Sequence, residues 1–241
     1  MAAFVDIHHH LIYGVDDGPK NSRKARQMVD AAYRDGVRTI FATSHVYAGR
    51  RKFDRAAYEA RLDELNEYCA EQGYNLEILP GAEVYYTDAA LRLLVNGEIP
   101  TLNGTRYVLL EASTRIKGED FVRAIRDVSN AGFIPVIAHI ERYPNLWSKV
   151  KLIRQTRAGF NFRIQVDAEV FLDRIPFFER RFIKALIKHD LIDYVASDAH
   201  DTAERRVCMR EVYNVLCEKY GKKYARSLTA ANQEELFAQE D

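Results

Sequence analysis

The chain has 241 residues, of which 47% are hydrophobic and 29% are charged, a size and balance typical of one globular domain. Its 35 basic and 35 acidic side chains cancel, so the net charge gives no reason to expect a nucleic acid or an anionic membrane as partner. The chain lacks a signal-like start and an apolar run near the roughly 18 residues of a membrane span. We therefore expect a cytoplasmic protein without direct membrane insertion.

Cysteine chemistry is not expected to carry the function. Cys69, Cys208 and Cys217 are odd in number and form no C-x-x-C pair, which argues against a disulfide framework and a thiolate zinc site. None of them begins the Cys-x5-Arg pattern of a thiol-dependent tyrosine phosphatase. The chain also lacks the glycine-rich loops G-x-x-x-x-G-K and G-x-G-x-x-G, which excludes the common nucleotide and dinucleotide sites.

Short β-branched or aromatic runs alternate with longer helical patterns along the whole chain. The seven predicted strands cover residues 4–8, 37–43, 76–80, 107–111, 133–139, 162–167 and 192–197. The first predicted helix places Ala25, Met28, Val29 and Ala32 on one apolar face and ends at Gly36. The second lies between Asp54 and Gly73 with an apolar face of Tyr58, Leu62, Leu65 and Cys69, and further helices are predicted near residues 119–131, 177–189 and 203–220.

The repeat of strand and helix predicts an α/β fold with a parallel sheet. Residues 134–138 are apolar almost without interruption, as in strands that crossover helices cover on both faces. We expect a barrel related to the (β/α)8 type. Because no low-complexity tract or Gly/Ser-rich linker interrupts the pattern, residues 1–241 are predicted to form a single domain.

Histidines and carboxylates follow six of the seven predicted strands, at the ends where the loops of such a barrel meet. They are His8, His10, Asp17, His45, Glu83, Glu111, His139, Asp198 and His200. Imidazole and carboxylate without thiolate suit Zn, Mn or Fe(II), and so many donors exceed what one ion can coordinate. The pattern predicts a cluster of two or three ions. His8 and His10 are two apart on a strand and point to one face, whereas His9 points to the other.

Each of these residues also has an ordinary structural interpretation. A lone H-x-H is often a satisfied polar pair at a strand end, and Glu111 could be a helix-capping or salt-bridged carboxylate. Asp198 could likewise cap a helix beside a surface histidine, His200. The histidines and carboxylates recur at the same place, the end of a predicted strand, and this recurrence favours the metal interpretation. His189 lies inside a helical pattern and lacks that placement, so we interpret it as structural.

Six motifs in order resemble the PHP (polymerase and histidinol phosphatase) superfamily, and more narrowly its manganese-dependent protein-tyrosine phosphatases from bacterial capsule and exopolysaccharide operons. The motifs are DIHHH at 6–10, GVDDGPK at 14–20, ATSH at 42–45, GAEVYY at 81–86, PVIAHIERY at 135–143 and ASDAH at 196–200. The similarity covers nearly the whole chain.

The resemblance implies a distorted (β/α)7 TIM-like barrel with three divalent ions, most often Mn(II), with Fe or Zn as alternatives. It implies one ion held by His8, His10, Glu83 and Asp198, a second by bridging Glu83 with Glu111 and His139, and a third by Asp17, His45 and His200. Two positions depart from the family pattern without removing a ligand. His9 stands where a small residue is usual, and Asp167 where the family tends to show Asn.

The implied reaction is hydrolysis of a phosphate monoester. Its dianion repels hydroxide, so a catalyst must neutralise the phosphoryl oxygens and supply hydroxide near neutral pH; we expect in-line attack by a metal-bridging hydroxide. A tyrosine phenolate has a reference pKa of about 10 and leaves with little help from a general acid.

Arg142 and Arg205 are placed to bind the ester or stabilise the departing oxygen. A surface ion pair is the alternative for both, and a stronger one for Arg205.

A loop after His45 carries Arg50 and Arg51 beside aromatic residues, and it is a candidate guide for an acidic or phosphorylated peptide; a solvated basic turn is the alternative. Tyr86 is a candidate pocket wall or, alternatively, a packing residue.

The resemblance implies a substrate in the phosphotyrosine-rich tail of a bacterial tyrosine kinase of polysaccharide export. Two alternatives stay open: a small-molecule phosphatase such as histidinol-phosphate phosphatase, and a non-catalytic metal-stabilised regulatory module.

Overall fold

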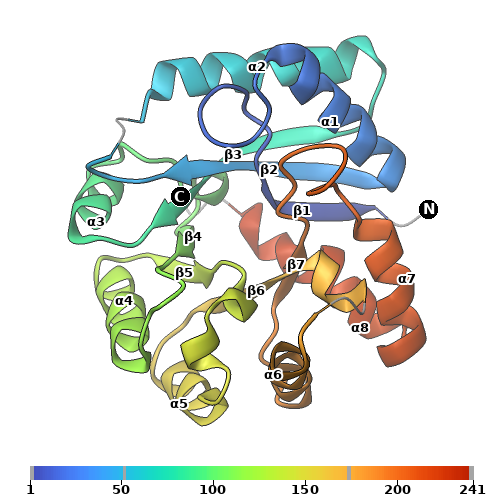
Figure 1. The fold of residues 1–241 in the computed structure, drawn as a ribbon. Coiled ribbons are helices and arrows are strands. Elements are labelled where there is room, and N and C mark those ends of the chain that lie inside the picture. The colour runs from blue at the N-terminus through green and yellow to red at the C-terminus, as the bar shows by residue number, and fades with distance from the viewer. Residues whose placement is uncertain (1–2, 51–52, 173–174, 239–241) are drawn as a thin grey trace.

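The computed structural model describes residues 3–50, 53–172 and 175–238. Within them, parallel strands form one sheet in chain order, from β1 to β7. The strands are β1 Phe4–His9, β2 Val37–Val46, β3 Glu77–Tyr85, β4 Tyr107–Glu111, β5 Ile134–Ile137, β6 Arg163–Asp167 and β7 Tyr194–Ala196. The helices form a ring outside the strands (Figure 1). They are α1 Ser22–Asp35, α2 Arg55–Glu71, α3 Asp88–Val95, α4 Gly118–Asn130, α5 Val150–Gly159, α6 Phe177–Lys188, α7 Met209–Tyr220 and α8 Lys222–Arg226.

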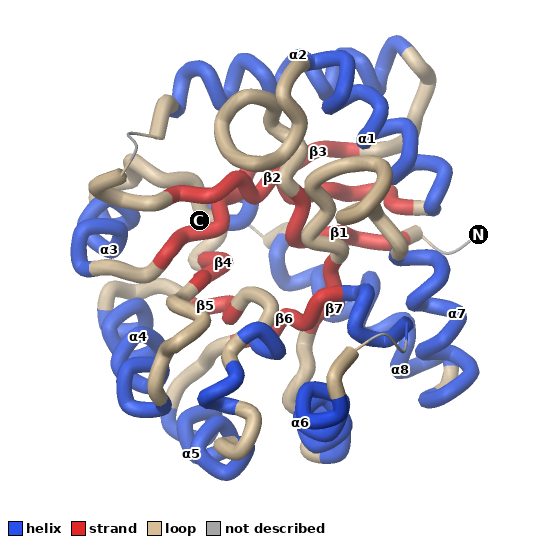
Figure 2. Tube along the Cα trace, viewed as in Figure 1, coloured by secondary structure: helices blue, strands red, loops and turns tan. Residues whose placement is uncertain are grey.

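The sheet curls into a nearly closed barrel, which confirms the predicted fold class (Figure 2). Its ends meet where β1 lies beside the segment that follows β7. There, the amide of Asp198 donates to the carbonyl of His8 at 2.8 Å, and the amide of His10 donates to the carbonyl of Ala199 at 2.9 Å. This closure brings two of the predicted metal-binding segments together through backbone hydrogen bonds.

The helix faces that the sequence predicted are the faces that pack on the sheet. Ala25, Met28, Val29 and Ala32 are the buried residues of α1, which ends at Gly36 with a left-handed φ of 100°. The buried residues of α2 are Tyr58, Leu62, Leu65 and Cys69, again as predicted. The sequence analysis did not identify α3 and α5, and α7 begins at Met209 rather than near residue 203, because residues 201–208 form a loop.

Strands β2 and β3 extend beyond their predicted ends at residues 43 and 80, so His45 and Glu83 lie within strands. The predicted third strand ended at Pro80, a residue whose backbone cannot donate a hydrogen bond. The hydroxyl of Tyr58, from α2, supplies bonds at this point: it accepts from the amide of Gly81 at 3.0 Å and lies 2.7 Å from the carbonyl of Ala42, as a donor. The ladder therefore continues past the proline.

The amino ends of the strands are closed by the C-terminal segment. Leu236 packs into the apolar interior of the barrel with Ile7, Phe41 and Leu109. The neighbouring carboxylate of Glu235 accepts hydrogen bonds from residues at the starts of three strands, namely Tyr107, Arg163 and Tyr194. With this end filled by side chains, the opposite end is left as the open mouth.

The described cysteines are all free, as predicted. Across the described ranges, no helix has both the length and the apolar character needed to cross a lipid bilayer.

Candidate metal centre

The nine histidines and carboxylates that the sequence selected converge at the carboxyl ends of the strands. Nε2 of His8 and Nε2 of His10 lie 3.1 Å apart. Each nitrogen lies 3.2 Å from Oε2 of Glu83 and 3.2 Å from Oδ1 of Asp198. Two imidazoles and two carboxylates thus face a common point, although they come from β1, the residue directly after it, β3 and the segment after β7.

The other predicted residues surround this point. Glu83 is the centre of the cluster: Oε1 lies 2.7 Å from Nε2 of His139, and Oε2 lies 2.8 Å from Nδ1 of His45. Glu111 approaches His45 at 3.7 Å. Oδ1 of Asp17 lies 3.2 Å from Nε2 of His200 and 3.5 Å from Nε2 of His45.

Four overlapping groups of donor atoms, each within 4.8 Å, contain all nine predicted residues. The groups are His10, Asp17, His45 and His200; His8, His10 and Asp198; His8, Glu83 and His139; and His45, Glu83 and Glu111. The geometric groups differ slightly from the assignment implied by the resemblance, because His10 also approaches the Asp17 group and His45 also approaches Glu111.

Unsatisfied buried atoms in the cluster fit a set of cations. His45 Nδ1, Glu83 Oε2, His139 Nδ1, Asp198 Oδ1 and His200 Nε2 are buried and make no well-formed hydrogen bond, although all except His139 Nδ1 lie within ion-pair distance of another cluster residue. Buried polar atoms are normally paired, and unpaired ones cost free energy. Oxygen and imidazole donors without thiolate suit Mn(II), Fe(II) or Zn(II). The donor set therefore fits divalent ions, and the overlap of the groups fits more than one.

The imidazoles and carboxylates of the cluster shift one another's pKa values. Burial lowers the pKa of His8, but the charges of Asp198 and Glu83 outweigh burial and raise it to about 9. Burial raises the pKa of Glu83, and His8 with the other imidazoles outweighs this effect and holds the pKa well below its usual range. Glu83 is therefore ionised and available to bind cations.

Two cluster residues adopt a backbone conformation that is rare outside glycine. His139 has φ 31° and Asp198 has φ 50°. Only four of the described non-glycine residues have a positive φ, the others being Asn103 and Asp190. Strain of this kind concentrates at functional sites, and here it directs two predicted ligands into the mouth.

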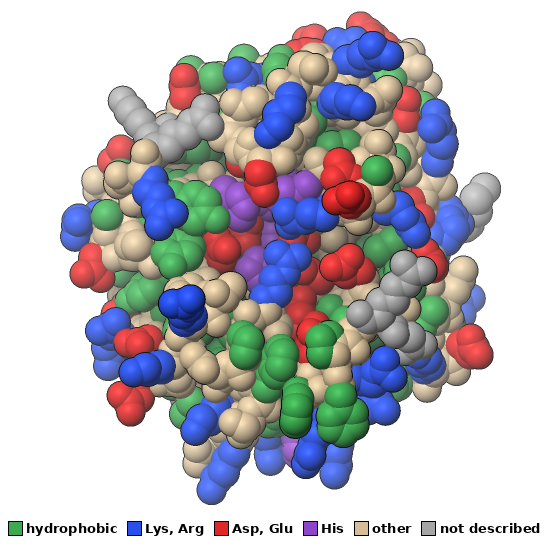
Figure 3. Space-filling view, viewed as in Figure 1, with side chains coloured by type: hydrophobic (Ala, Val, Ile, Leu, Met, Phe, Trp, Pro, Cys, Tyr) green, Lys and Arg blue, Asp and Glu red, His purple; other side chains and the backbone are tan. Residues whose placement is uncertain are grey.

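The two predicted catalytic arginines lie across the cluster. Nη2 of Arg142 lies 2.5 Å from Oδ2 of Asp167 and 2.6 Å from Oδ2 of Asp198. Nη2 of Arg205 lies 2.7 Å from the same Asp198 oxygen, and its Nη1 lies 3.4 Å from Asp17. Each arginine side chain is 37% exposed. Figure 3 shows the resulting hollow, in which basic side chains cross a floor of histidines and acidic groups.

The sequence profile of a family described as "Capsular polysaccharide synthesis, CpsB/CapC" matches residues 4–238. The chain belongs to the CpsB/CapC family. It is 33% identical over 239 residues to the protein named tyrosine-protein phosphatase CpsB of Streptococcus pneumoniae, covering 97% of this chain and 98% of that one. It is 31% identical over 228 residues to tyrosine-protein phosphatase YwqE of Bacillus subtilis strain 168, covering 93% and 88%. The family resemblance inferred from the motifs is thereby confirmed.

Solved structures agree with this assignment. A chain from the crystal structures of YwqE from Bacillus subtilis and CpsB from Streptococcus pneumoniae, described as unique metal-dependent tyrosine phosphatases, superposes with a TM-score of 0.87 at 29% identity, covering 98% of this chain and 95% of that one. Histidinol phosphate phosphatase of Lactococcus lactis superposes with a TM-score of 0.55 at 14% identity, covering 92% and 93%. The second likeness shows a shared fold alone.

Two residues that the sequence analysis did not select contact the predicted ligands. Asp16 Oδ2 accepts from Nδ1 of His10 at 2.8 Å. Gln165 Oε1 accepts from the amide of His139 at 2.7 Å and lies 3.2 Å from Nδ1 of His8. Such partners fix imidazole orientation. A signal for Gln165 exists in the sequence: it is an uncharged polar residue between Ile164 and Val166 of a predicted strand, and the structure buries it fully.

Of the three residues predicted to bind substrate, the two that the structure describes have different surroundings. The guanidinium of Arg50 lies 5.7 Å from the ring centre of Tyr47, whose hydroxyl donates to Glu111 at 3.1 Å. Arg51 falls outside the described residues. The hydroxyl of Tyr86 donates to Asp127 on α4 at 2.9 Å, and the ring packs on the main core, which are the contacts of a packing residue.

His9 is buried but belongs to none of the donor groups. Burial is the main reason why its pKa falls to about 3, so the ring stays neutral. Asp167, the other departure from the family pattern, contacts Arg142 and accepts a hydrogen bond from the side-chain amide of Gln165 at 2.9 Å.

Proposed function

We propose that this chain is a metal-dependent protein-tyrosine phosphatase, a phosphoric monoester hydrolase. The observation that carries the proposal is the convergence of nine imidazole and carboxylate side chains, several of whose buried atoms make no well-formed hydrogen bond. The names of the full-length relatives and the TM-score of 0.87 to metal-dependent tyrosine phosphatases support the same activity.

The proposed cofactor is a cluster of three divalent ions, with Mn(II) first and Fe or Zn as alternatives. His8, His10, Glu83 and Asp198 would hold one ion; Glu83, Glu111 and His139 a second; and Asp17, His45 and His200 a third. Such ions, when bound, neutralise phosphoryl oxygens and make hydroxide available near neutral pH. The distances of 2.7 to 3.7 Å between these donors and their partners support the assignment.

The side chains of the protein then have defined tasks. Arg142 and Arg205 point their guanidinium groups at Asp198 from the open side of the cluster, where a phosphate ester would enter. Guanidinium groups bind phosphate oxygens through charge-assisted hydrogen bonds. We propose that they orient the ester and stabilise the leaving phenolate. Because a phenolate with a pKa of about 10 departs readily, a dedicated general acid is not required.

We further propose the biological setting. The substrate would be a phosphotyrosine-bearing bacterial tyrosine kinase of polysaccharide export, and the reaction would regulate capsular or exopolysaccharide synthesis. The description of the family, capsular polysaccharide synthesis, supports this setting. The free cysteines fit a reducing, cytoplasmic location. We propose that residues 1–241 act as one metallophosphatase domain.

Turnover of a phosphotyrosine peptide tests the activity. We expect the Mn(II)-loaded protein to hydrolyse it at mildly alkaline pH, chelation to abolish the reaction, and Mn(II) to restore it. His139→Ala should remove the activity, whereas Asp63→Asn, on the exposed face of α2, should retain it. A metal-saturated protein that leaves phosphotyrosine intact but hydrolyses histidinol phosphate would replace this proposal with the small-molecule alternative. If His139→Ala loses turnover but still binds the kinase or a polysaccharide enzyme equally well and keeps its cellular effect, the regulatory module would be favoured.

A further inference from the structure

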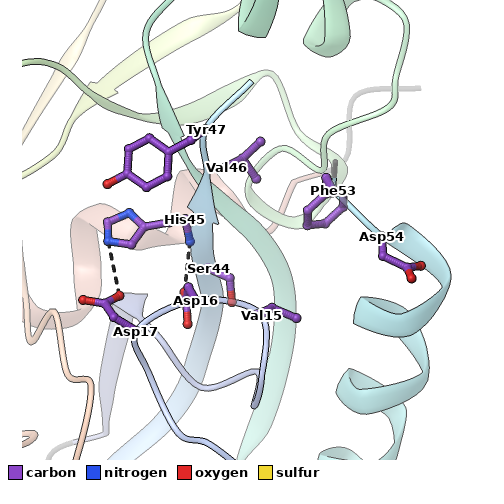
Figure 4. Close-up of a pocket in the computed structure, with 9 residues that line it drawn as sticks. All are labelled: Val15, Asp16, Asp17, Ser44, His45, Val46, Tyr47, Phe53 and Asp54. Atoms are coloured by element: carbon purple, nitrogen blue, oxygen red, sulfur yellow. Dashed lines mark hydrogen bonds and ion pairs between the residues drawn. The ribbon is translucent and has the colours of Figure 1, made fainter. Parts of the chain in front are cut away.

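A cleft of about 310 Å³ opens beside the metal centre, between the loop after β1 and the end of β2. Figure 4 shows Tyr47 and His45 on one side and Phe53 on the other, with Val46 between them and Val15 below. Asp17 and His45 line the cleft and also belong to one group of predicted metal ligands. The cleft is therefore continuous with the metal centre.

Apart from the hydroxyl of Ser44, the walls that remain for an occupant are apolar, although three aspartates line the cleft. Asp16 is engaged by His10 and by the amide of His45. Asp17 pairs with His45 and His200, and Asp54 caps α2 by accepting from the amide of Ala57 at 3.1 Å. With these charges engaged, Val15, Val46, Tyr47 and Phe53 provide the surface for a neutral group.

Tyr47 is held as a fixed aromatic wall. Its ring centre lies 5.0 Å from that of His45 and 5.3 Å from that of Tyr85. Its hydroxyl donates to Glu111 at 3.1 Å. A ring fixed in this way is suited to stack against another aromatic ring.

We propose that this cleft receives the aryl ring of the substrate ester, and this inference rests on the proposed phosphatase function. A phosphoryl group at the ions held by Asp17 and His45 would place its ester oxygen at the inner end of the cleft. A volume of about 310 Å³ is at the lower end for ligand sites and accommodates one ring rather than a long apolar chain. The cleft thus selects phosphotyrosine over alkyl phosphates, whose short side chains would leave it unfilled.

Two substitutions of opposite kind test the proposal in the Mn(II)-loaded protein. Val15→Phe fills the cleft, and Phe53→Ala removes one wall. Each should raise KM for a phosphotyrosine peptide by about tenfold or more, the effect of losing burial of one aromatic ring. Inhibition by inorganic phosphate, which contacts only the metal centre, should not change, and neither should the manganese content. Phe178→Ala serves as matched control, because Phe178 is 67% exposed and lies outside the cleft.

The outcomes separate the two proposals. If the unmodified protein hydrolyses the peptide and both variants keep its KM, the cleft does not bind the ring, while the phosphatase function stands. If the Mn(II)-loaded protein binds inorganic phosphate but hydrolyses no phosphotyrosine, the proposed function fails and the aryl assignment fails with it. Phe53 packs 5.3 Å from the ring of Tyr58, so Phe53→Ala risks misfolding; Val15→Phe then decides alone. Parallel weakening of phosphate and peptide binding would also overturn the aryl assignment.

Discussion

Replacing Asp16 by asparagine should weaken metal binding without removing any ligand. The Asp16 side chain is 3% exposed. Oδ2 accepts from Nδ1 of His10 at 2.8 Å and from the amide of His45 at 3.0 Å, and Oδ1 accepts from the amide of Gly18 at 3.0 Å. Burial raises the pKa of Asp16, but the hydrogen bonds from His10, Gly18 and His45 outweigh it and lower the pKa. Asp16 is therefore an ionised acceptor with both oxygens in use.

Asparagine offers only one oxygen, so in either orientation its amide group faces an N–H donor. With the amide NH2 toward His10, the favoured tautomer carries its proton on Nε2, the atom that faces Glu83 and Asp198. Loss of such an orienting partner typically costs 10–100-fold in metal affinity, which corresponds to about 1.4 to 2.7 kcal/mol. We expect an effect within this range for Asp16→Asn.

Calorimetric titration of the metal-free protein with Mn(II) measures the effect. Asp63→Asn makes the same chemical change at an exposed position of α2 and should bind Mn(II) like the unmodified chain. Circular dichroism of the metal-free variants checks that both are folded. An unchanged dissociation constant for Asp16→Asn would refute the role of Asp16 in orienting His10.

Two further predictions concern acid stability and catalysis. The pKa of His9 is about 3 in the folded chain and about 6.5 when unfolded, so between these values the unfolded state binds one more proton and stability falls with falling pH. From pH 7 to 5, the free energy of unfolding of the metal-free protein, measured in urea, should fall by about 2 kcal/mol more than that of His9→Gln. Equal losses in the two proteins would contradict the low pKa of His9. Arg142→Ala should lower kcat for a phosphotyrosine peptide on the order of 100-fold, whereas Arg154→Ala, exposed on α5, should not. Equal kcat values would remove Arg142 from the reaction.

The convergence of the nine histidines and carboxylates could be predicted from the sequence because these residues repeat one rule. A histidine or carboxylate at the end of a parallel strand points into the mouth, and the rule holds for residues as distant in sequence as His8 and Asp198. Helix faces were predictable for a similar reason: apolar spacing in α1 and α2 leaves only one face that can be buried.

Residues whose role depends on a distant partner could not be predicted in this way. Gln165 acts through the backbone of His139 and the ring of His8, contacts that no local pattern encodes. The length of β3 depends on Tyr58, a residue of another element that compensates for Pro80. Tyr86 was selected for its place after Glu83, but its hydroxyl is drawn to Asp127 on α4.

Anomalous diffraction at the manganese edge, from crystals grown with Mn(II), tests the central claim most directly. We predict adjacent manganese peaks at the barrel mouth, bridged by Glu83, with every one of the nine donors bound to an ion: His8, His10, Asp17, His45, Glu83, Glu111, His139, Asp198 and His200. Manganese peaks elsewhere on the protein, with Glu83 and Asp198 still paired only to histidines, would contradict the account.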